Sequence, residues 1–182
     1  MKQFHDSKIL LHVCCGICGL EVIQRLKRNF NEVVLFFYNP NVQPKKEYQR
    51  RLTVVRQIAR SQKLKLVEGV CETARWLKTV KGLENEPEGG LRCPFCFEFR
   101  LAKTAETAEK SDYAWFATTL TVSPHKPAAI INAIGTKLAE KHGLKFLAED
   151  FKKKDGFKKT MAAAKKHNFY RQNYCGCLFS LN

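Results

Sequence analysis

Cysteine is the residue whose spacing in this 182-residue sequence points most clearly to chemistry. Closely spaced thiols in a reducing compartment are typical of metal ligation or thiol redox chemistry, although free cysteines can also be small buried hydrophobes. Seven of the eight cysteines fall into three groups: Cys14, Cys15 and Cys18 in Cys-Cys-Gly-Ile-Cys, Cys93 and Cys96 in Cys-Pro-Phe-Cys, and Cys175-Gly176-Cys177. The eighth, Cys71, stands alone and is interpreted as structural.

The first two groups have the spacing of metal ligands. The first is expected in a tight turn, where Gly16 leaves room for a cluster or ligand to approach the backbone. In the second, Cys93 and Cys96 share one face of the helix that they are expected to open, and the amides of a helix N-terminus favour thiolate. Four thiolates can hold either a structural zinc ion or a [4Fe–4S] cluster.

The third group has a different chemistry. A disulfide between Cys175 and Cys177 would close a small, strained ring, which makes such a bond oxidising and exchangeable. Near a C-terminus, the pair is suited to deliver or accept two electrons. The alternatives are two further metal ligands or two idle thiols.

Strands alternate with helices along the chain, which predicts an α/β fold with a mainly parallel five-stranded sheet flanked by helices. We expect one domain over 1–182, with a core at about 8–150 followed by a basic helix and a cysteine-bearing C-terminal tail at 151–182. The predicted strands are 8–13, 32–38, 64–67, 113–120 and 144–147. The predicted helices are 17–28, 44–62, 72–80, 94–110, 123–142 and 157–167.

This order of elements gives the cysteines a place in the fold. Cys14 and Cys15 follow the first strand, and Thr118–Ser123 ends the fourth. In parallel sheets, sites lie beyond the carboxyl ends of the strands, so both segments face one cleft if these strands are neighbours. Ligands at such a cleft favour a reactive cluster over zinc, because zinc usually stabilises small, loop-rich modules.

The charge of the chain suggests a polyanionic partner. There are 32 Lys and Arg against 17 Asp and Glu, and the excess is concentrated in 45–65 and 141–171. Such blocks suit nucleic acid phosphates, although a basic soluble protein without such a partner is the alternative. No apolar run reaches the ~20 residues that span a bilayer, and the first residues lack a signal-peptide pattern, so we expect a cytoplasmic protein with no membrane partner.

Taken together, these segments resemble the QueH family of epoxyqueuosine reductases. The resemblance covers nearly the whole chain in the order of the family's motifs. It is carried by the segments 10–18, 39–41, 47–48, 92–101, 118–126 and 170–177.

The resemblance implies a HUP-like fold, related to the adenine nucleotide α-hydrolases, in which a cysteine loop replaces the phosphate loop. It implies a [4Fe–4S] cluster held by the residues that match Cys14, Cys15, Cys93 and Cys96. An additional mononuclear iron is implied beside the cluster, with a first-loop ligand near Cys18. Cys175 and Cys177 match the redox-active pair of the family, and no cobalamin is expected.

The implied reaction is the last step of queuosine formation in tRNA. The epoxide of epoxyqueuosine in the anticodon is reduced to an alkene with two electrons and two protons, and water is released. The electron donor and the oligomeric state are left open by the sequence.

Several polar and aromatic residues are candidates for contacts with this substrate. His125 lies near the expected cleft and is the candidate proton donor, because an imidazole exchanges protons near neutral pH. Tyr174 is the best candidate to stack on a splayed base, and Arg171, Thr119 and Lys126 are further candidate substrate-binding residues. His12, inside the first strand, is interpreted as a hydrogen-bonded core residue.

Two other functions are compatible with parts of the pattern. One is a tRNA thiolation enzyme on the same HUP scaffold, which would need an ATP-binding glycine–serine loop in place of Cys14–Cys18. The other is a non-enzymatic RNA-binding module stabilised by zinc.

Overall fold

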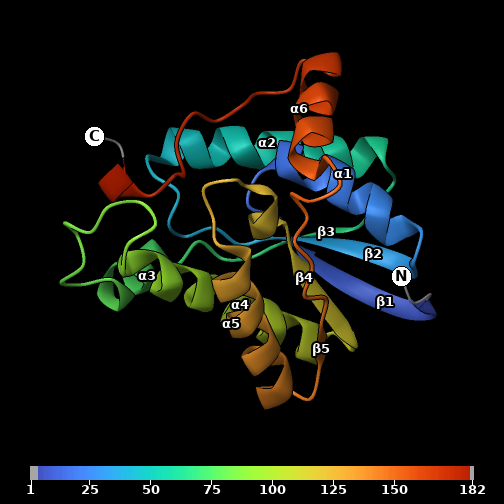
Figure 1. The fold of residues 1–182 in the computed structure, drawn as a ribbon, viewed down its shortest axis with the longest axis horizontal. Coiled ribbons are helices and arrows are strands. Elements are labelled where there is room, and N and C mark those ends of the chain that lie inside the picture. The colour runs from blue at the N-terminus through green and yellow to red at the C-terminus, as the bar shows by residue number, and fades with distance from the viewer. Residues whose placement is uncertain (1–3, 181–182) are drawn as a thin grey trace.

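The computed structural model describes residues 4–180. It shows a five-stranded parallel sheet with helices on both faces (Figure 1). The strand order is β3-β2-β1-β4-β5. The strands are β1 (Phe4–His12), β2 (Phe30–Phe37), β3 (Leu66–Glu68), β4 (Trp115–Thr118) and β5 (Lys145–Phe146). The helices are α1 (Gly16–Lys27), α2 (Lys45–Ser61), α3 (Thr73–Thr79), α4 (Arg92–Lys110), α5 (Ala128–Lys141) and α6 (Gly156–Lys166), with short 3-10 helices η1 (Thr119–Val122) and η2 (Leu178–Ser180).

The predicted fold class is confirmed. The largest differences from the predicted elements lie at the start of β1, which begins at Phe4 and not at Lys8, and after β4. The strand predicted to reach Leu120 ends at Thr118, because the Thr118 side chain accepts a hydrogen bond from the Leu120 amide and turns the chain into η1. The next helix begins at Ala128 and not at Ser123. The Ser123 hydroxyl instead accepts the His125 amide at 3.3 Å, within a turn that precedes the helix.

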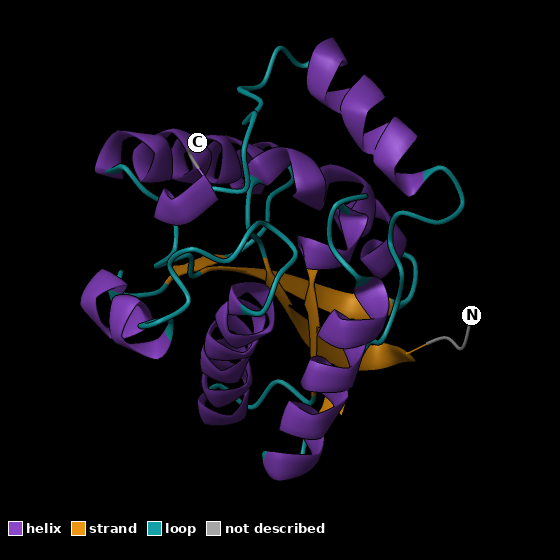
Figure 2. Cartoon of the chain, turned by 60° about the vertical axis from the view of Figure 1, so that its left-hand side comes forward, coloured by secondary structure: helices purple, strands orange, loops and turns teal. Residues whose placement is uncertain are grey.

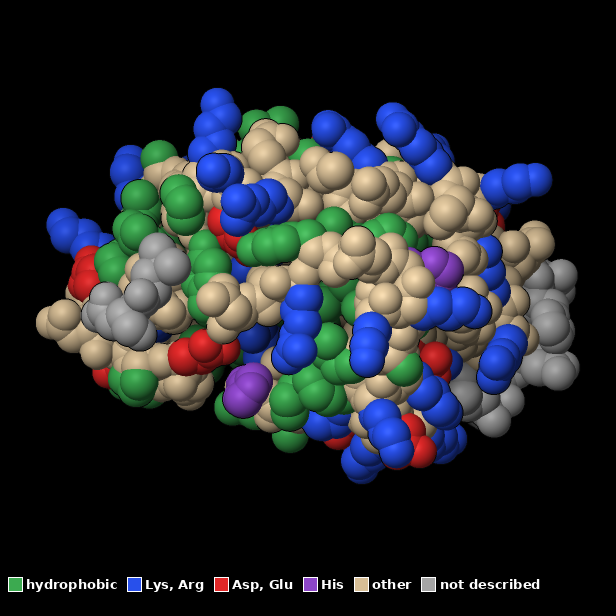
Figure 3. All heavy atoms as spheres, turned by 90° about the horizontal axis from the view of Figure 1, so that it is seen from above, with side chains coloured by type: hydrophobic (Ala, Val, Ile, Leu, Met, Phe, Trp, Pro, Cys, Tyr) green, Lys and Arg blue, Asp and Glu red, His purple; other side chains and the backbone are tan. Residues whose placement is uncertain are grey.

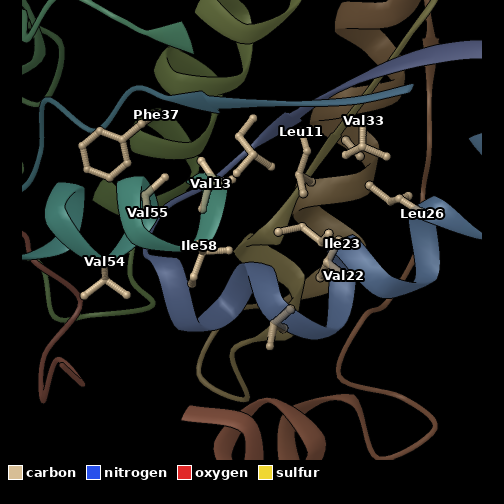
Figure 4. Packing of buried hydrophobic residues seen from close by; sticks show 14 of the residues in the cluster. Leu11, Val13, Val22, Ile23, Leu26, Val33, Phe37, Val54, Val55 and Ile58 are labelled. Carbon is tan, nitrogen blue, oxygen red and sulfur yellow. The ribbon is translucent and has the colours of Figure 1, made fainter. Parts of the chain in front are cut away.

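Alternate residues of the central strands face opposite layers of helices. Ile9 and Leu11 of β1 belong to the cluster that α1 and α2 cover, whereas Leu10 packs with α4 and α5. Figure 4 shows the first cluster, in which Leu11 and Val33 point from the sheet toward α1. Both faces of the central strands are therefore buried, which explains why the sequences of these strands are continuous apolar runs.

Gly16 allows α1 and α2 to pack closely against each other. A Cβ atom at Gly16 would lie 2.5 Å from Val54 Cγ1 and 3.0 Å from Ile58 Cδ1 of α2. The space that we expected to admit a cluster or ligand is thus filled by α2. The glycine is needed because it lets the start of α1, which carries the first cysteine group, approach α2 closely.

The crossover from β3 to β4 returns the chain to the other side of β1, so β1 has β2 and β4 as its neighbours. His12 pairs with Thr118 at the carboxyl ends of these two strands. As predicted, the first cysteine group and the segment after β4 meet at one end of the sheet. This is the switch point at which open α/β sheets place their sites.

The C-terminal segment returns across the molecule to the same end of the sheet. α6 packs against α1, and a long loop then leads toward η2 (Figure 2). Cys177 forms an isolated antiparallel bridge with Val42, just before α2, and the Gln43 amide donates to the Gly176 carbonyl at 2.8 Å. Of the helices within residues 4–180, none is both long and apolar enough to cross a membrane.

Candidate metal and redox site

The three cysteines of the first loop converge at the start of α1. Their sulfur atoms all lie within 4.8 Å of one another, and the Cys14 and Cys15 sulfurs are 3.9 Å apart. Cys15 is buried, whereas Cys14 and Cys18 are partly exposed. This arrangement suits a soft metal centre, because three thiols are preassembled at the N-terminus of a helix.

Hydrogen bonds from distant segments hold this loop in place. The Thr119 hydroxyl accepts from the Cys14 amide at 3.2 Å and donates to the Cys14 sulfur at 3.4 Å. The Gln172 amide group donates to the Cys15 sulfur at 3.0 Å. The chain segments after β4 and after α6 therefore both contribute to the geometry of the cysteine loop.

Protonation differs among the three thiols because they share hydrogen bonds. Side-chain hydrogen bonds with Cys15 and Cys18 hold the pKa of Cys14 well below its ordinary value. The same interaction with Cys14 raises the pKa of Cys15 to about 12, and it raises that of Cys18 as well. Of the three thiols, Cys14 is therefore the one whose ionisation is favoured.

The second cysteine group lies in the first turns of α4 and faces the third group. Cys93, Cys96, Cys175 and Cys177 line one small cavity of about 20 Å³. Burial raises the pKa of the Cys96 thiol, although the charge of Arg100 opposes this effect. The CxxC and CxC groups, about 80 residues apart in sequence, are neighbours here.

The CxC group forms a tight turn with two unlike thiols. Gly176 has φ +100°, and a Cβ atom there would lie 2.8 Å from the Arg51 guanidinium, so glycine is required on both counts. The hydrogen bond from Cys177, together with the Ser180 hydroxyl and the charge of Lys126, lowers the pKa of Cys175 to about 5. The same hydrogen bond raises the pKa of Cys177.

A buried ion pair on α2 fixes this turn. Arg51 donates to the carbonyl oxygens of Tyr174 and Cys175 at 3.1 and 2.9 Å, and it pairs with Glu47 at 2.7 Å. The Tyr170 hydroxyl donates to the other oxygen of Glu47 at 2.6 Å. Arg51 therefore acts as a clamp that positions Cys175 and Cys177 from α2.

A larger cavity of about 390 Å³ opens between the first cysteine loop and the C-terminal tail. Cys14, Cys18 and Cys175 all line it, so two of the cysteine groups are exposed to the same space. Five residues line both this cavity and the smaller one: Glu88, Arg100, His125, Lys126 and Cys175. The three cysteine groups therefore surround one connected region beyond the carboxyl ends of β1 and β4.

Four of the five non-cysteine candidates from the sequence line the larger cavity. His125 and Arg171 are exposed there, and Lys126 and Tyr174 are partly buried. The Tyr174 hydroxyl donates to the Gln43 carbonyl, and its ring lies under the Arg51 guanidinium at 5.4 Å. Thr119 is the fifth candidate, and its buried hydroxyl forms hydrogen bonds with the amide and the sulfur of Cys14.

His12 and Cys71 lie outside the cavity. His12 is fully buried and lies 2.8 Å from the Thr118 hydroxyl and 3.2 Å from the Tyr38 carbonyl, which confirms its role in the core. Cys71 is exposed between β3 and α3, with Thr73 as its hydrogen-bonding neighbour at 3.4 Å. Cys71 was interpreted as structural, but its exposed thiol is not part of the packed core.

Sequence reasoning missed Arg51, Arg100 and Gln172. Arg51 and Gln172 act on cysteines more than 120 positions away, so no local pattern could reveal them. The sequence could have identified Arg100, because it follows Cys96 by four residues and therefore shares its helix face.

Comparison with known proteins identifies the family of this chain. A family model described as epoxyqueuosine reductase QueH matches residues 9–182. The chain belongs to the QueH family. It is 37% identical to the epoxyqueuosine reductase QueH of Streptococcus pyogenes serotype M1, over 98% of this chain and 72% of that protein. It is 38% identical to the protein of the same name from Thermotoga maritima, over 95% of this chain and 90% of that protein.

A solved structure supports the QueH fold assignment. The U34-tRNA thiolase NcsA of Methanococcus maripaludis, solved with its [4Fe–4S] cluster, aligns with a TM-score of 0.61 at 11% identity. The alignment covers 98% of this chain and 62% of the thiolase. Together with the parallel order β3-β2-β1-β4-β5, it shows that the chain shares the α/β fold of the thiolase.

Proposed function

We propose that this QueH family member reduces the epoxide of epoxyqueuosine in tRNA to the alkene of queuosine. The observation that carries the proposal is the connected region, which is lined by three cysteine groups, three buried arginines and an exposed histidine. Membership of a family of reductases favours this function over a tRNA thiolase or a zinc-stabilised RNA-binding module.

We assign Cys14, Cys15, Cys93 and Cys96 as ligands of a [4Fe–4S] cluster, with Cys18 beside them as a ligand of an additional iron. The donor set fits, because the loop sulfurs already converge and CxxC faces the same region from α4. When bound, such a cluster supplies single electrons, and an iron with a free coordination position supplies a Lewis acid.

The cavity residues are suited to hold the modified nucleoside. Tyr174 offers an aromatic face beside Cys175, and Arg171 offers a charge for a phosphate oxygen. His125 is exposed in the cavity, and we assign it as the donor of a proton to the epoxide oxygen. Lys126 binds an anionic or oxygen-rich group, and Thr119 positions Cys14.

Oxidation of Cys175 and Cys177 supplies the two electrons that the reaction consumes. Oxidation of the two thiols to one disulfide releases two electrons and two protons, and the epoxide consumes the same number to give an alkene and water. An external reductant must then cleave the disulfide by reducing it back to two thiols. The low pKa of Cys175 supports this role, because the thiolate is the species that exchanges.

We assign the tRNA strand to a groove of about 660 Å³ between α2 and the tail. Lys46 and Arg50 line it from α2, and Phe169 and Tyr170 line it from the tail. Figure 3 shows many Lys and Arg side chains on the face seen from above, to which α2 and α6 contribute. Basic and aromatic groups along one groove suit a single-stranded nucleic acid loop.

Metal analysis tests the assignment of the cluster. After anaerobic reconstitution, we expect iron and inorganic sulfide in the protein, with the broad visible absorption of an iron–sulfur cluster. A colourless protein that takes up one zinc ion and no iron would favour the RNA-binding alternative.

A substitution in the CxC pair tests its redox role. Cys175→Ser should retain iron and sulfide but lose repeated turnover, since one thiol cannot form the intramolecular disulfide. Cys71→Ser is the matched control, because Cys71 is exposed outside the cavity, and it should turn over as the wild type does. Repeated turnover by the Cys175 variant would refute the assignment.

A further inference from the structure

Arg100 is a buried cation whose Nε atom is unpaired. It is 3% exposed, and its Nη2 atom donates to Asn39 Oδ1 at 2.6 Å. Among residues 4–180, its Nε atom has no hydrogen-bond partner and no carboxylate pairs with it. A guanidinium buried without a counter-charge is strongly unfavourable, so a compensating anion is expected nearby.

The other two buried arginines of this region do not share this property. Arg51 pairs with Glu47 and donates to two carbonyl oxygens. Arg92 donates to the carbonyl oxygens of Leu83 and Glu84 at 2.9 and 3.0 Å, and to that of Glu86. The unmet capacity of Arg100 is therefore a property of its position, and not of buried arginines in this fold generally.

The position of Arg100 is between the first two cysteine groups. It lies one helical turn after Cys96 on α4, and it lines both cavities. Its charge acts on both Cys14 and Cys96. Asn39, its partner, also donates to the carbonyl of Val13 at 2.9 Å, so the guanidinium is tied to the residue that precedes the cysteine loop.

We propose that Arg100 is the counter-cation of the cysteine-bound metal centre and a positioning residue that raises its reduction potential. The inference rests on the proposed function, because it needs a negatively charged cluster between Cys14 and Cys96. Reduction adds one more negative charge to such a centre, and a fixed buried cation stabilises the reduced state more than the oxidised state. The unpaired Nε atom is then available to a thiolate or sulfide of the centre.

Redox titration of the reconstituted protein tests this role without measuring turnover. Arg100→Gln removes the charge but keeps a polar side chain, and it should shift the equilibrium toward the oxidised cluster by at least tenfold. For a one-electron couple this is a potential lower by ~59 mV or more. Arg100→Lys keeps the charge and should remain close to the wild type. Equal potentials for the wild type and Arg100→Gln would overturn the proposal.

A second variant covers the case in which Arg100→Gln fails to assemble the cluster. Asn39→Asp keeps Arg100 but places a carboxylate against its Nη2 atom, and it should also lower the potential. An unchanged or higher potential in Asn39→Asp would contradict the role of Arg100. If the wild type itself assembles no iron–sulfur cluster, the proposed function fails together with this inference. If the cluster assembles but its reduction potential does not depend on Arg100, only the inference is overturned.

Discussion

The surroundings of each cysteine, and not its spacing alone, decide what its thiol can do in this fold. Cys175 and Cys177 are two positions apart, yet the pKa of Cys175 is lowered to about 5 and that of Cys177 is raised. Lys126 is part of the cause, because its charge faces Cys175 from the segment after β4. The spacing of the pair was visible in the sequence, but this asymmetry depends on contacts made across the fold.

The low pKa of Cys175 predicts an unusual pH dependence of its alkylation. In Cys177→Ser, which keeps a hydroxyl donor, iodoacetamide should label Cys175 at a nearly constant rate from pH 8 to about pH 6. The rate should fall only as the pH approaches 5, since the thiolate persists above its pKa. Peptide mass spectrometry measures the rate. A tenfold fall per pH unit starting near pH 8.5, as for an ordinary thiol, would contradict the prediction.

If Cys96 is a ligand of the proposed cluster, its loss should remove the cluster without unfolding the chain. We expect Cys96→Ala to bind little iron and sulfide after reconstitution, while far-ultraviolet circular dichroism stays close to that of the wild type. Cys71→Ala is the control and should retain the full metal content. Wild-type iron and sulfide in Cys96→Ala would remove Cys96 from the ligand set.

At the scale of elements, close packing of α1 on α2 places the first cysteine loop. The sequence predicted both helices to within about two residues at each end, because their apolar periodicity is strong. It did not predict that Gly16 serves this contact, because the side chains that fill the space come from another helix. The turn of η1 was also missed, since a Thr118 side-chain hydrogen bond outweighs the strand preference of the residues that follow.

A double-mutant cycle tests the contact between the helices. Gly16→Ala should lower the free energy of unfolding by about 1–3 kcal/mol, because the new methyl group overlaps Val54. Val54→Ala alone should also destabilise the protein by leaving a void. The double variant should lose less stability than the sum of both, as measured by urea denaturation. Strict additivity would show that the two positions do not interact.

The clamp formed by Arg51 should control the C-terminal tail. Arg51→Gln leaves Glu47 buried without its partner, which should cost about 3–5 kcal/mol and release the two carbonyl oxygens of the tail. Limited proteolysis should then cleave the segment after α6 earlier than in the wild type. The control is Arg60→Gln, which changes an exposed arginine near the end of the same helix. Equal cleavage rates in both variants would argue against the clamp.

At the scale of the whole molecule, the topology explains how distant segments make one site. Adjacent β1 and β4 bring Cys14 near Thr119, as the alternation of strands and helices predicted. The return of the tail to α2 was not predictable, because it depends on single contacts such as those of Arg51. Charge blocks in the sequence indicated a nucleic acid partner, but the groove between α2 and the tail exists only in the folded chain.

Charge reversal should distinguish the groove from the rest of the basic surface. Lys46→Glu with Arg50→Glu should weaken tRNA binding and reduce the slope of log affinity against log salt concentration by about 2. Lys137→Glu with Lys141→Glu makes the same change in charge on α5, across the sheet, and should affect binding much less. Filter binding at several salt concentrations measures both. Equal effects of the two pairs would place the tRNA elsewhere.

The most direct test of the proposed reaction is its product. Reconstituted protein is incubated anaerobically with tRNA that carries epoxyqueuosine and with a chemical reductant, and the nucleosides are then analysed by liquid chromatography and mass spectrometry. We predict that queuosine appears with the wild type and is absent with Cys96→Ala. Unchanged epoxyqueuosine after incubation with iron-loaded, reduced wild-type protein would contradict the assignment of this chain as an epoxyqueuosine reductase.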